Sequence, residues 1–245
     1  MFSWTRKEPA LPQIWHSFKS INSVTNELEE FTVQDLPRER HSEAVDHMLE
    51  HFLSDEPICK SKSVKNDAAA LKEICSLWKK VLKQNVVISC FKKNCSEIVG
   101  LNMLCVITKD DYKDFKLEVR NDNTWKAVHE FALVNFNLFE RYKFASSILI
   151  AYGLSVSKDY RRRGIATEIL RARIPLCRAL QIPVTSTVFT AIGSQKPAEK
   201  IGFKVDFEIE YKDLADFHDE FIFENLETSS LKIMSLVINE NDNEN

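Results

Sequence analysis

Hydrophobic side chains recur at helical spacing along much of the chain. Within residues 42–53 they stand three and four positions apart, which predicts an amphipathic helix with its apolar stripe at Val45, Met48, Leu49 and Phe52. Residues 66–82 follow the same period and predict a second helix. We expect another helix over residues 124–142.

Shorter apolar runs, bounded by polar or turn-forming residues, predict strands. Residues 85–91 and 97–107 have the pattern of an antiparallel hairpin, and residues 146–156 are apolar nearly throughout, as expected for a strand buried on both faces. After them we expect a helix and a short helix alternating with the remaining strands. These remaining strands are predicted at 184–189, 202–211 and 231–238. One early strand is predicted at 31–36.

The chain length of 245 residues allows one substantial hydrophobic core. We expect a single domain over residues 31–240. Residues 1–30 are expected to be an N-terminal extension, either a packed arm or a loose tail, because their aromatic residues show no clear periodicity. Residues 241–245 are expected to be a loose polar tail.

Composition argues against several classes of protein. With 28% charged residues and a formal net charge of -3, a general binder of nucleic acid is not expected. The N-terminus lacks the apolar run of a secretory signal, so secretion is not expected. No segment approaches about twenty uninterrupted apolar residues, so no membrane partner is expected either. The six cysteines form no CxxC pair, which is typical of reduced thiols. We therefore expect a cytoplasmic protein, and a monomer.

The stretch SKDYRRRGIATEIL, residues 157–170, places three arginines and a glycine at the predicted start of a helix. Such a run could be a nucleic-acid patch, a solvated charged surface or a cradle for a phosphorylated cofactor. A buried strand that ends at this turn leaves free N–H groups at the positive end of the helix dipole, which favours an anion. The predicted anion site consists of Arg161, Arg162, Arg163, Gly164, Ile165 and Ala166.

Arg161, Gly164 and Ala166 fit the pattern Gln or Arg, two residues, Gly, one residue, Gly or Ala. In this respect the segment resembles the pyrophosphate-binding motif of the GCN5-related N-acetyltransferases (GNAT). The resemblance implies acetyl-coenzyme A as co-substrate and an α+β fold (α/β in the broad sense). That fold is a central mixed, mostly antiparallel, splayed sheet of about seven strands flanked by helices. It further implies that backbone at Leu154 and Val156 binds the coenzyme.

The stretch EHFLSDEPICKS resembles the signature after the first helix of insect arylalkylamine N-acetyltransferases. The resemblance implies that Glu56 is the general base, acting through ordered water. An ordinary glutamate is too acidic for this task, so burial would have to raise its pKa. The alternative is an acidic turn that faces water at the end of a helix.

Two hydroxyl residues, Thr190 and Ser194, fall where insect members of this family tend to carry hydroxyls near the sulfur of the coenzyme. A hydroxyl there could support the tetrahedral intermediate or return a proton to the thiolate. Ser194 could equally be a helix N-cap, with Pro197 in the first turn. Gly193 stands where relatives often have an aromatic residue, which leaves the proton donor unassigned.

The remaining candidates are weaker. His47 and His51 lie one helical turn apart and could share a metal, but without a third ligand a solvated polar face is the better interpretation, and no metal is expected. No role is assigned to His129 or His218. Pro175 should kink or end the helix that follows the glycine turn, because its ring displaces a hydrogen bond to Arg171.

The leading hypothesis is an N-acetyltransferase that transfers acetyl from acetyl-coenzyme A to a small arylalkylamine-like acceptor by direct attack. Polyamine-like and fatty-acyl variants share the same motifs. The alternative is a non-catalytic acyl-coenzyme A binder or partner-docking protein of the same fold. A metal hydrolase that uses the two histidines of the first helix is a distant third. Phe52, Phe189 and the aromatic residues from Trp125 to Phe139 suggest an apolar pocket or core.

Overall fold

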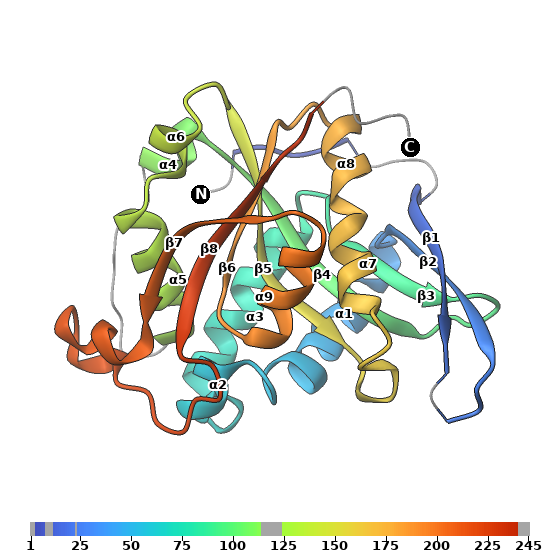
Figure 1. Ribbon diagram of the computed structural model, residues 1–245, viewed down its shortest axis with the longest axis horizontal. Helices are drawn as coiled ribbons and strands as arrows, with labels where there is room; N and C mark the ends of the chain where they lie inside the picture. The colour runs from blue at the N-terminus through green and yellow to red at the C-terminus, as the bar shows by residue number, and fades with distance from the viewer. Residues whose placement is uncertain (1–2, 8–11, 23, 114–123, 240–245) are drawn as a thin grey trace.

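The computed structural model describes residues 3–7, 12–22, 24–113 and 124–239. Its centre is an eight-stranded sheet in the order β1-β2-β3-β4-β5-β6-β8-β7, antiparallel except where β5 meets β6 (Figure 1). The strands are β1 Ile14–Ile21, β2 Leu28–Asp35, β3 Ile88–Lys92, β4 Ile98–Thr108, β5 Ser147–Val156, β6 Val184–Phe189, β7 Lys204–Glu210 and β8 Ser230–Val237.

Helices cover both faces of the sheet (Figure 1). Apolar side chains of α1, α3 and α5 pack on one face, and those of α7 and α8 pack on the other. The α-helices are α1 His41–His47, α2 Pro57–Ser61, α3 Ala68–Leu82, α4 Lys109–Lys113, α5 Thr124–Asn135, α6 Leu138–Arg141, α7 Ile165–Arg171, α8 Arg173–Ala179 and α9 Ile192–Lys200. No helix in the described part of the chain is both long and apolar enough to span a membrane.

The helices begin and end where the local sequence allows. Asp67 caps α3 by accepting hydrogen bonds from the N–H groups of Ala69 and Ala70, at 2.8 and 3.1 Å. The predicted helix over residues 42–53 is present as α1 followed by one π-helical turn, η2 Met48–Phe52. The predicted effect of Pro175 is also present, because α7 ends at Arg171 and a separate α8 follows.

The N-terminal region departs from the sequence analysis. β1 is an edge strand of the sheet, paired antiparallel with β2, so the expected boundary at residue 31 falls inside β2. The sheet gains one strand over the seven expected. Alternation of buried and exposed positions in β1 is imperfect, which explains why its pattern was missed. The predicted tail, residues 241–245, and most of the charged stretch before α5 lie outside the described residues.

The strands β5 and β6 diverge. Their only paired residues are Leu149 and Thr185, near the start of each strand, whereas β4 pairs with β5 along its whole length. Beyond Leu149, β5 therefore has no strand partner on the side of β6. The predicted splay of the sheet is confirmed, and it opens a cleft between these two strands.

Candidate active site

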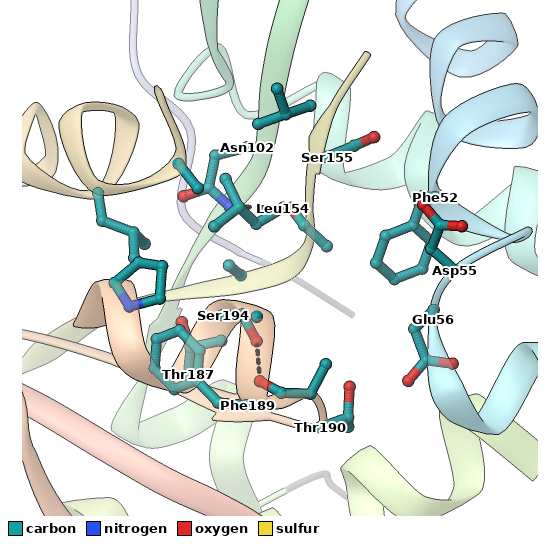
Figure 2. A pocket seen from close by; sticks show the side chains of 18 of the residues that line it. Phe52, Asp55, Glu56, Asn102, Leu154, Ser155, Thr187, Phe189, Thr190 and Ser194 are labelled. Carbon is teal, nitrogen blue, oxygen red and sulfur yellow. Dashed lines mark hydrogen bonds between the residues drawn. The ribbon is translucent and has the colours of Figure 1, made fainter. Parts of the chain in front are cut away.

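A cleft of about 580 Å³ lies in the splay between β5 and β6 (Figure 2). It receives side chains from the turn before α2, from β5, from the turn before α7, from the end of β6 and from α9. All the site residues predicted from sequence line it except Arg163, namely Glu56, Leu154, Val156, Arg161, Arg162, Gly164, Ile165, Ala166, Thr190 and Ser194. Residues distant in sequence are thus brought to one cavity.

The turn before α7 provides an open cradle at one end of the cleft. Gly164 has φ +77°, and a Cβ added there would meet nothing within 4 Å. Arg162 also has a positive φ, +61°, and its side chain lines the cleft. The left-handed conformation at Gly164 favours glycine, and the open space beside it lets a ligand approach the main chain.

The three arginines of this turn are not equivalent. Arg163 points away from the cleft: its side chain is only 3% exposed, is ion-paired with Glu29 and packs against the rings of Phe31 and Tyr160. Its predicted guanidinium contact with a cofactor is therefore not supported, because this charge is already paired in the wall behind the turn. Of the three arginines, Arg161 and Arg162 line the cleft.

Arg161 connects the glycine turn to the turn that carries Glu56. Its guanidinium donates to the carbonyl oxygens of Val156 and His51, at 2.9 and 3.2 Å, and forms an ion pair with Asp55. Charge-assisted bonds of this kind are stronger and more directional than neutral ones. One side chain thus fixes the end of β5 relative to the acidic turn.

Glu56 is buried, with only 5% of its surface exposed, although it lines the cleft. It caps α2 by accepting a hydrogen bond from the Cys59 N–H at 2.6 Å, while its Oε1 has no hydrogen-bond partner among the described residues. Burial raises the pKa of Glu56, against smaller opposing effects of the Cys59 N–H and the Thr190 hydroxyl. The alternative of a solvated acidic turn fits Asp55, whose side chain is half-exposed, but does not fit Glu56.

Thr190 and Ser194 lie across the cleft from Glu56 (Figure 2). The carbonyl oxygen of Thr190 accepts a 2.7 Å hydrogen bond from the Tyr211 hydroxyl, which fixes the end of β6. Ser194 donates its hydroxyl proton to the carbonyl oxygen of Ala191 at 2.9 Å (Figure 2). Both hydroxyl groups therefore lie on the wall that faces the buried carboxylate.

The start of α9 differs from the prediction. Ala191 is its N-cap, so Ser194 lies in the first turn and does not cap the helix, because the helix begins three residues earlier than an N-cap at Ser194 would place it. Pro197 consequently lies in the second turn and cannot donate to the carbonyl oxygen of Gly193. A Cβ added at Gly193 would meet nothing within 4 Å, so the cleft has open space beside this residue.

Arg173 lines the cleft at the base of the splay, and the sequence analysis missed it. It is wholly buried, and its guanidinium donates to the Thr187 hydroxyl and to the carbonyl oxygens of Leu149 and Ser186, at 2.9, 3.2 and 3.1 Å. Burial lowers the pKa of Arg173 to about 10, so it remains a cation at neutral pH. An arginine within an amphipathic helix normally faces water, so its sequence carries no signal of this role.

His47 and His51 do not form the solvated polar face expected from the sequence. Their ring centroids lie 4.7 Å apart with the ring planes tilted by 60°, and His47 is buried. Burial, with the nearby His51 and Arg161, lowers the pKa of His47 to about 4, which keeps it neutral. Among the residues that the structure describes, no group of three His, Cys, Asp or Glu side chains could hold a metal ion.

Comparison with solved structures identifies relatives. A protein from the yellow fever mosquito Aedes aegypti, named arylalkylamine N-acetyltransferase 7, aligns at a TM-score of 0.89 with 38% identity over 97% of this chain and 100% of that chain. Arylalkylamine N-acetyltransferase 2 from Aedes aegypti aligns at 0.73 with 21% identity, over 85% and 99% of the two chains. The Drosophila melanogaster polyamine N-acetyltransferase aligns at 0.72 with 15% identity, over 85% and 100%. No protein-family model and no curated protein sequence matches.

The splayed, mostly antiparallel sheet and the glycine turn beside its central cleft define the fold as that of the GCN5-related N-acetyltransferases. The two relatives of lower identity support the fold alone. The likeness at 38% identity over nearly the whole chain extends further: the protein belongs to the arylalkylamine N-acetyltransferase family, whose members are acyltransferases.

Proposed function

We propose that the protein transfers the acetyl group of acetyl-coenzyme A to the amine of a small arylalkylamine-like acceptor, with Glu56 as general base. The observation that carries this proposal is the buried carboxylate of Glu56, which lines the same cleft as the open glycine turn and whose Oε1 has no hydrogen-bond partner among the described residues. An anion cradle and a candidate base thus occupy one cavity. The six cysteines are free thiols, which fits the cytoplasm, and we propose that the enzyme works there as a monomer.

The residues present fit coenzyme A. The main chain around Gly164 and the side chains of Arg162 and Lys200 would hold the pyrophosphate and phosphate groups, because all of them line the cleft and both side chains are cationic. The unpaired edge of β5 at Leu154 and Val156 would bind the extended pantetheine arm through backbone hydrogen bonds. The bound coenzyme supplies the thioester; the protein supplies its orientation.

Glu56 would take the proton of the acceptor amine. An alkylammonium with a pKa near 10.4 is neutral in only about one molecule in a few thousand at pH 7, which costs about 4 to 5 kcal/mol. A buried carboxylate with a raised pKa can accept this proton, directly or through ordered water, as the amine nitrogen bonds to the thioester carbon. The raised pKa makes Glu56 a better base than an ordinary glutamate.

The thioester carbon–sulfur bond then breaks, and the departing thiolate must gain a proton to leave as coenzyme A. Thr190 and Ser194 carry two of the hydroxyl groups on the side of the cleft formed by the end of β6 and by α9 (Figure 2). We assign them to hydrogen bonding with the tetrahedral intermediate and the thiolate. Of the two, Thr190 lies close enough to Glu56 to influence its pKa, so it is placed to pass the proton on.

Coenzyme binding tests the cradle. In Gly164→Leu, a side chain fills the open space at a left-handed backbone position, so affinity for coenzyme A measured by titration calorimetry should fall at least ten-fold. Gly202→Leu is the matched control, since Gly202 has φ +97° but does not line the cleft, and its coenzyme affinity should stay at the wild-type value. Equal coenzyme affinity in wild type and Gly164→Leu would refute the assignment of the Gly164 turn as the phosphate-binding site.

Turnover tests the reaction. Purified protein should release free thiol from acetyl-coenzyme A in the presence of an arylalkylamine such as tryptamine. Coenzyme binding without acetylation of any amine in a broad panel would instead support the non-catalytic alternative, which the open space beside Gly193 would then explain.

A further inference from the structure

His129 is a buried imidazole in the wall of the cleft that the proposed reaction does not use. It projects from α5, lines the cleft and is only 4% exposed. Its ring lies against aromatic neighbours, with ring centroids 4.4 Å from Trp125 and 6.3 Å from Tyr152. Buried polar atoms are normally hydrogen-bonded, so each of the two ring nitrogens of His129 is expected to have a partner.

The hydrogen bond of one nitrogen fixes the state of the other. Nδ1 lies 2.9 Å from the carbonyl oxygen of Trp125, and since a carbonyl can only accept, Nδ1 carries the proton. Burial lowers the pKa of His129 to about 4, so the ring stays neutral at pH 7. Nε2 then carries a lone pair and can only accept a hydrogen bond, and it has no partner among the described residues. The cleft wall therefore contains a hydrogen-bond acceptor without a donor.

Side-chain contacts connect the surroundings of Glu56 to His129. Phe52 lies one turn before Glu56, and its ring is 5.8 Å from that of Trp125, which in turn lies against His129. Phe52 and His129 both line the cleft. A substrate amine whose nitrogen reaches Glu56 would then lie along Phe52, with its aryl end directed toward His129.

The chemistry of the wall selects the kind of donor. A second ammonium or guanidinium group would need a carboxylate, but the described residues of the cleft offer only Glu56 and Asp55, and Asp55 is ion-paired with Arg161. A cation placed between aromatic rings and a neutral imidazole would lose most of its hydration. A neutral hydroxyl loses little, and it supplies the proton that Nε2 lacks.

We propose that Nε2 of His129 accepts a hydrogen bond from a hydroxyl on the aryl ring of the acceptor, so that hydroxylated arylalkylamines are preferred to their unsubstituted counterparts. This inference rests on the proposed function and specifies its substrate. His129 acts here on specificity, through the end of the acceptor that does not react.

The test compares tyramine with phenethylamine, which differ only in the phenolic hydroxyl. Wild-type kcat/KM should be about ten-fold or more higher for tyramine, because phenethylamine leaves Nε2 without a donor. In His129→Phe the ratio should fall to about one, because the loss of kcat/KM is larger with tyramine than with phenethylamine, which has no hydroxyl for Nε2. His129→Gln, which restores an acceptor oxygen, should recover part of the preference.

A third amine makes the test independent of any variant. 4-Methoxyphenethylamine keeps the ring oxygen but cannot donate, so wild-type enzyme should treat it no better than phenethylamine. Equal kcat/KM for tyramine and phenethylamine in the wild type, or an unchanged ratio in His129→Phe, would overturn the inference and leave the transferase activity standing. Acetylation of none of the three amines would instead remove the proposed function, and this inference with it.

Discussion

Replacing Glu56 with Gln separates the base from the rest of the site. The carboxamide keeps the size of the side chain and an oxygen that can accept from the Cys59 N–H, but it cannot take a proton from the amine. General-base catalysis contributes about 10² to 10⁴ in rate, so kcat/KM at pH 7 should fall by that factor while coenzyme affinity is retained.

The pH dependence of this loss is more informative than its size. Each rise of one pH unit below about pH 10 makes roughly ten times more free amine neutral, so the advantage of a protein base shrinks. The ratio of wild-type to Glu56→Gln kcat/KM should therefore decrease steadily between pH 7 and pH 9, as measured with free-thiol detection. A ratio that stays constant with pH, or full activity of Glu56→Gln at pH 7, would refute the role of Glu56.

Stability should respond in the opposite sense to activity. Because burial raises the pKa of Glu56 above the ordinary value of 4.5, the folded state binds this proton more tightly than the unfolded state, and ionisation costs folding free energy as pH rises past 4.5. Each pH unit by which burial moves the pKa corresponds to about 1.4 kcal/mol. In urea denaturation, Glu56→Gln should gain stability over wild type between pH 5 and pH 8. Glu39→Gln, at an exposed glutamate outside the cleft, should show no such trend.

Two further substitutions test how the cleft is held open. Trp78 is wholly buried and donates its indole N–H to the carbonyl oxygen of Tyr152 at 2.9 Å. Trp78→Phe should therefore lower the free energy of unfolding by about 1 to 3 kcal/mol in urea titrations. An unchanged free energy of unfolding would mean that this hydrogen bond is not maintained. Arg173→Met leaves the carbonyl oxygens of Leu149 and Ser186 without their donor and should cost about 2 to 5 kcal/mol. A gain in stability in thermal melts would show that the buried charge is the larger cost.

Most of the fold could be predicted from the sequence because its elements have strong local patterns. The helix with Val45 and Met48 on its apolar stripe, and the strand over residues 146–156, both stand where periodicity placed them. β1 could not be found in this way. It is an edge strand with one solvated side, and at Ile14 and Ile21 it exposes apolar side chains, which removes the alternation that marks a strand.

The candidate site was predicted less evenly. A motif identifies the residue type at a position but not the direction of its side chain, which is why Arg163 was assigned to the cofactor although it pairs with Glu29. His129 and Arg173 gave no signal, because in a single sequence a buried polar residue looks like an exposed one. Their surroundings come from α5, β5 and β6, which only the folded chain brings together.

Arg161 has a consequence for how the two halves of the reaction are linked. Its guanidinium joins the end of β5 to the acidic turn before α2, so a ligand that displaces Arg161 also changes the contacts of Asp55, the neighbour of Glu56 in the chain. Thermodynamic coupling of this kind is reciprocal. If coenzyme binding changes the proton affinity of Glu56 by some factor, protonation of Glu56 changes the coenzyme affinity by the same factor.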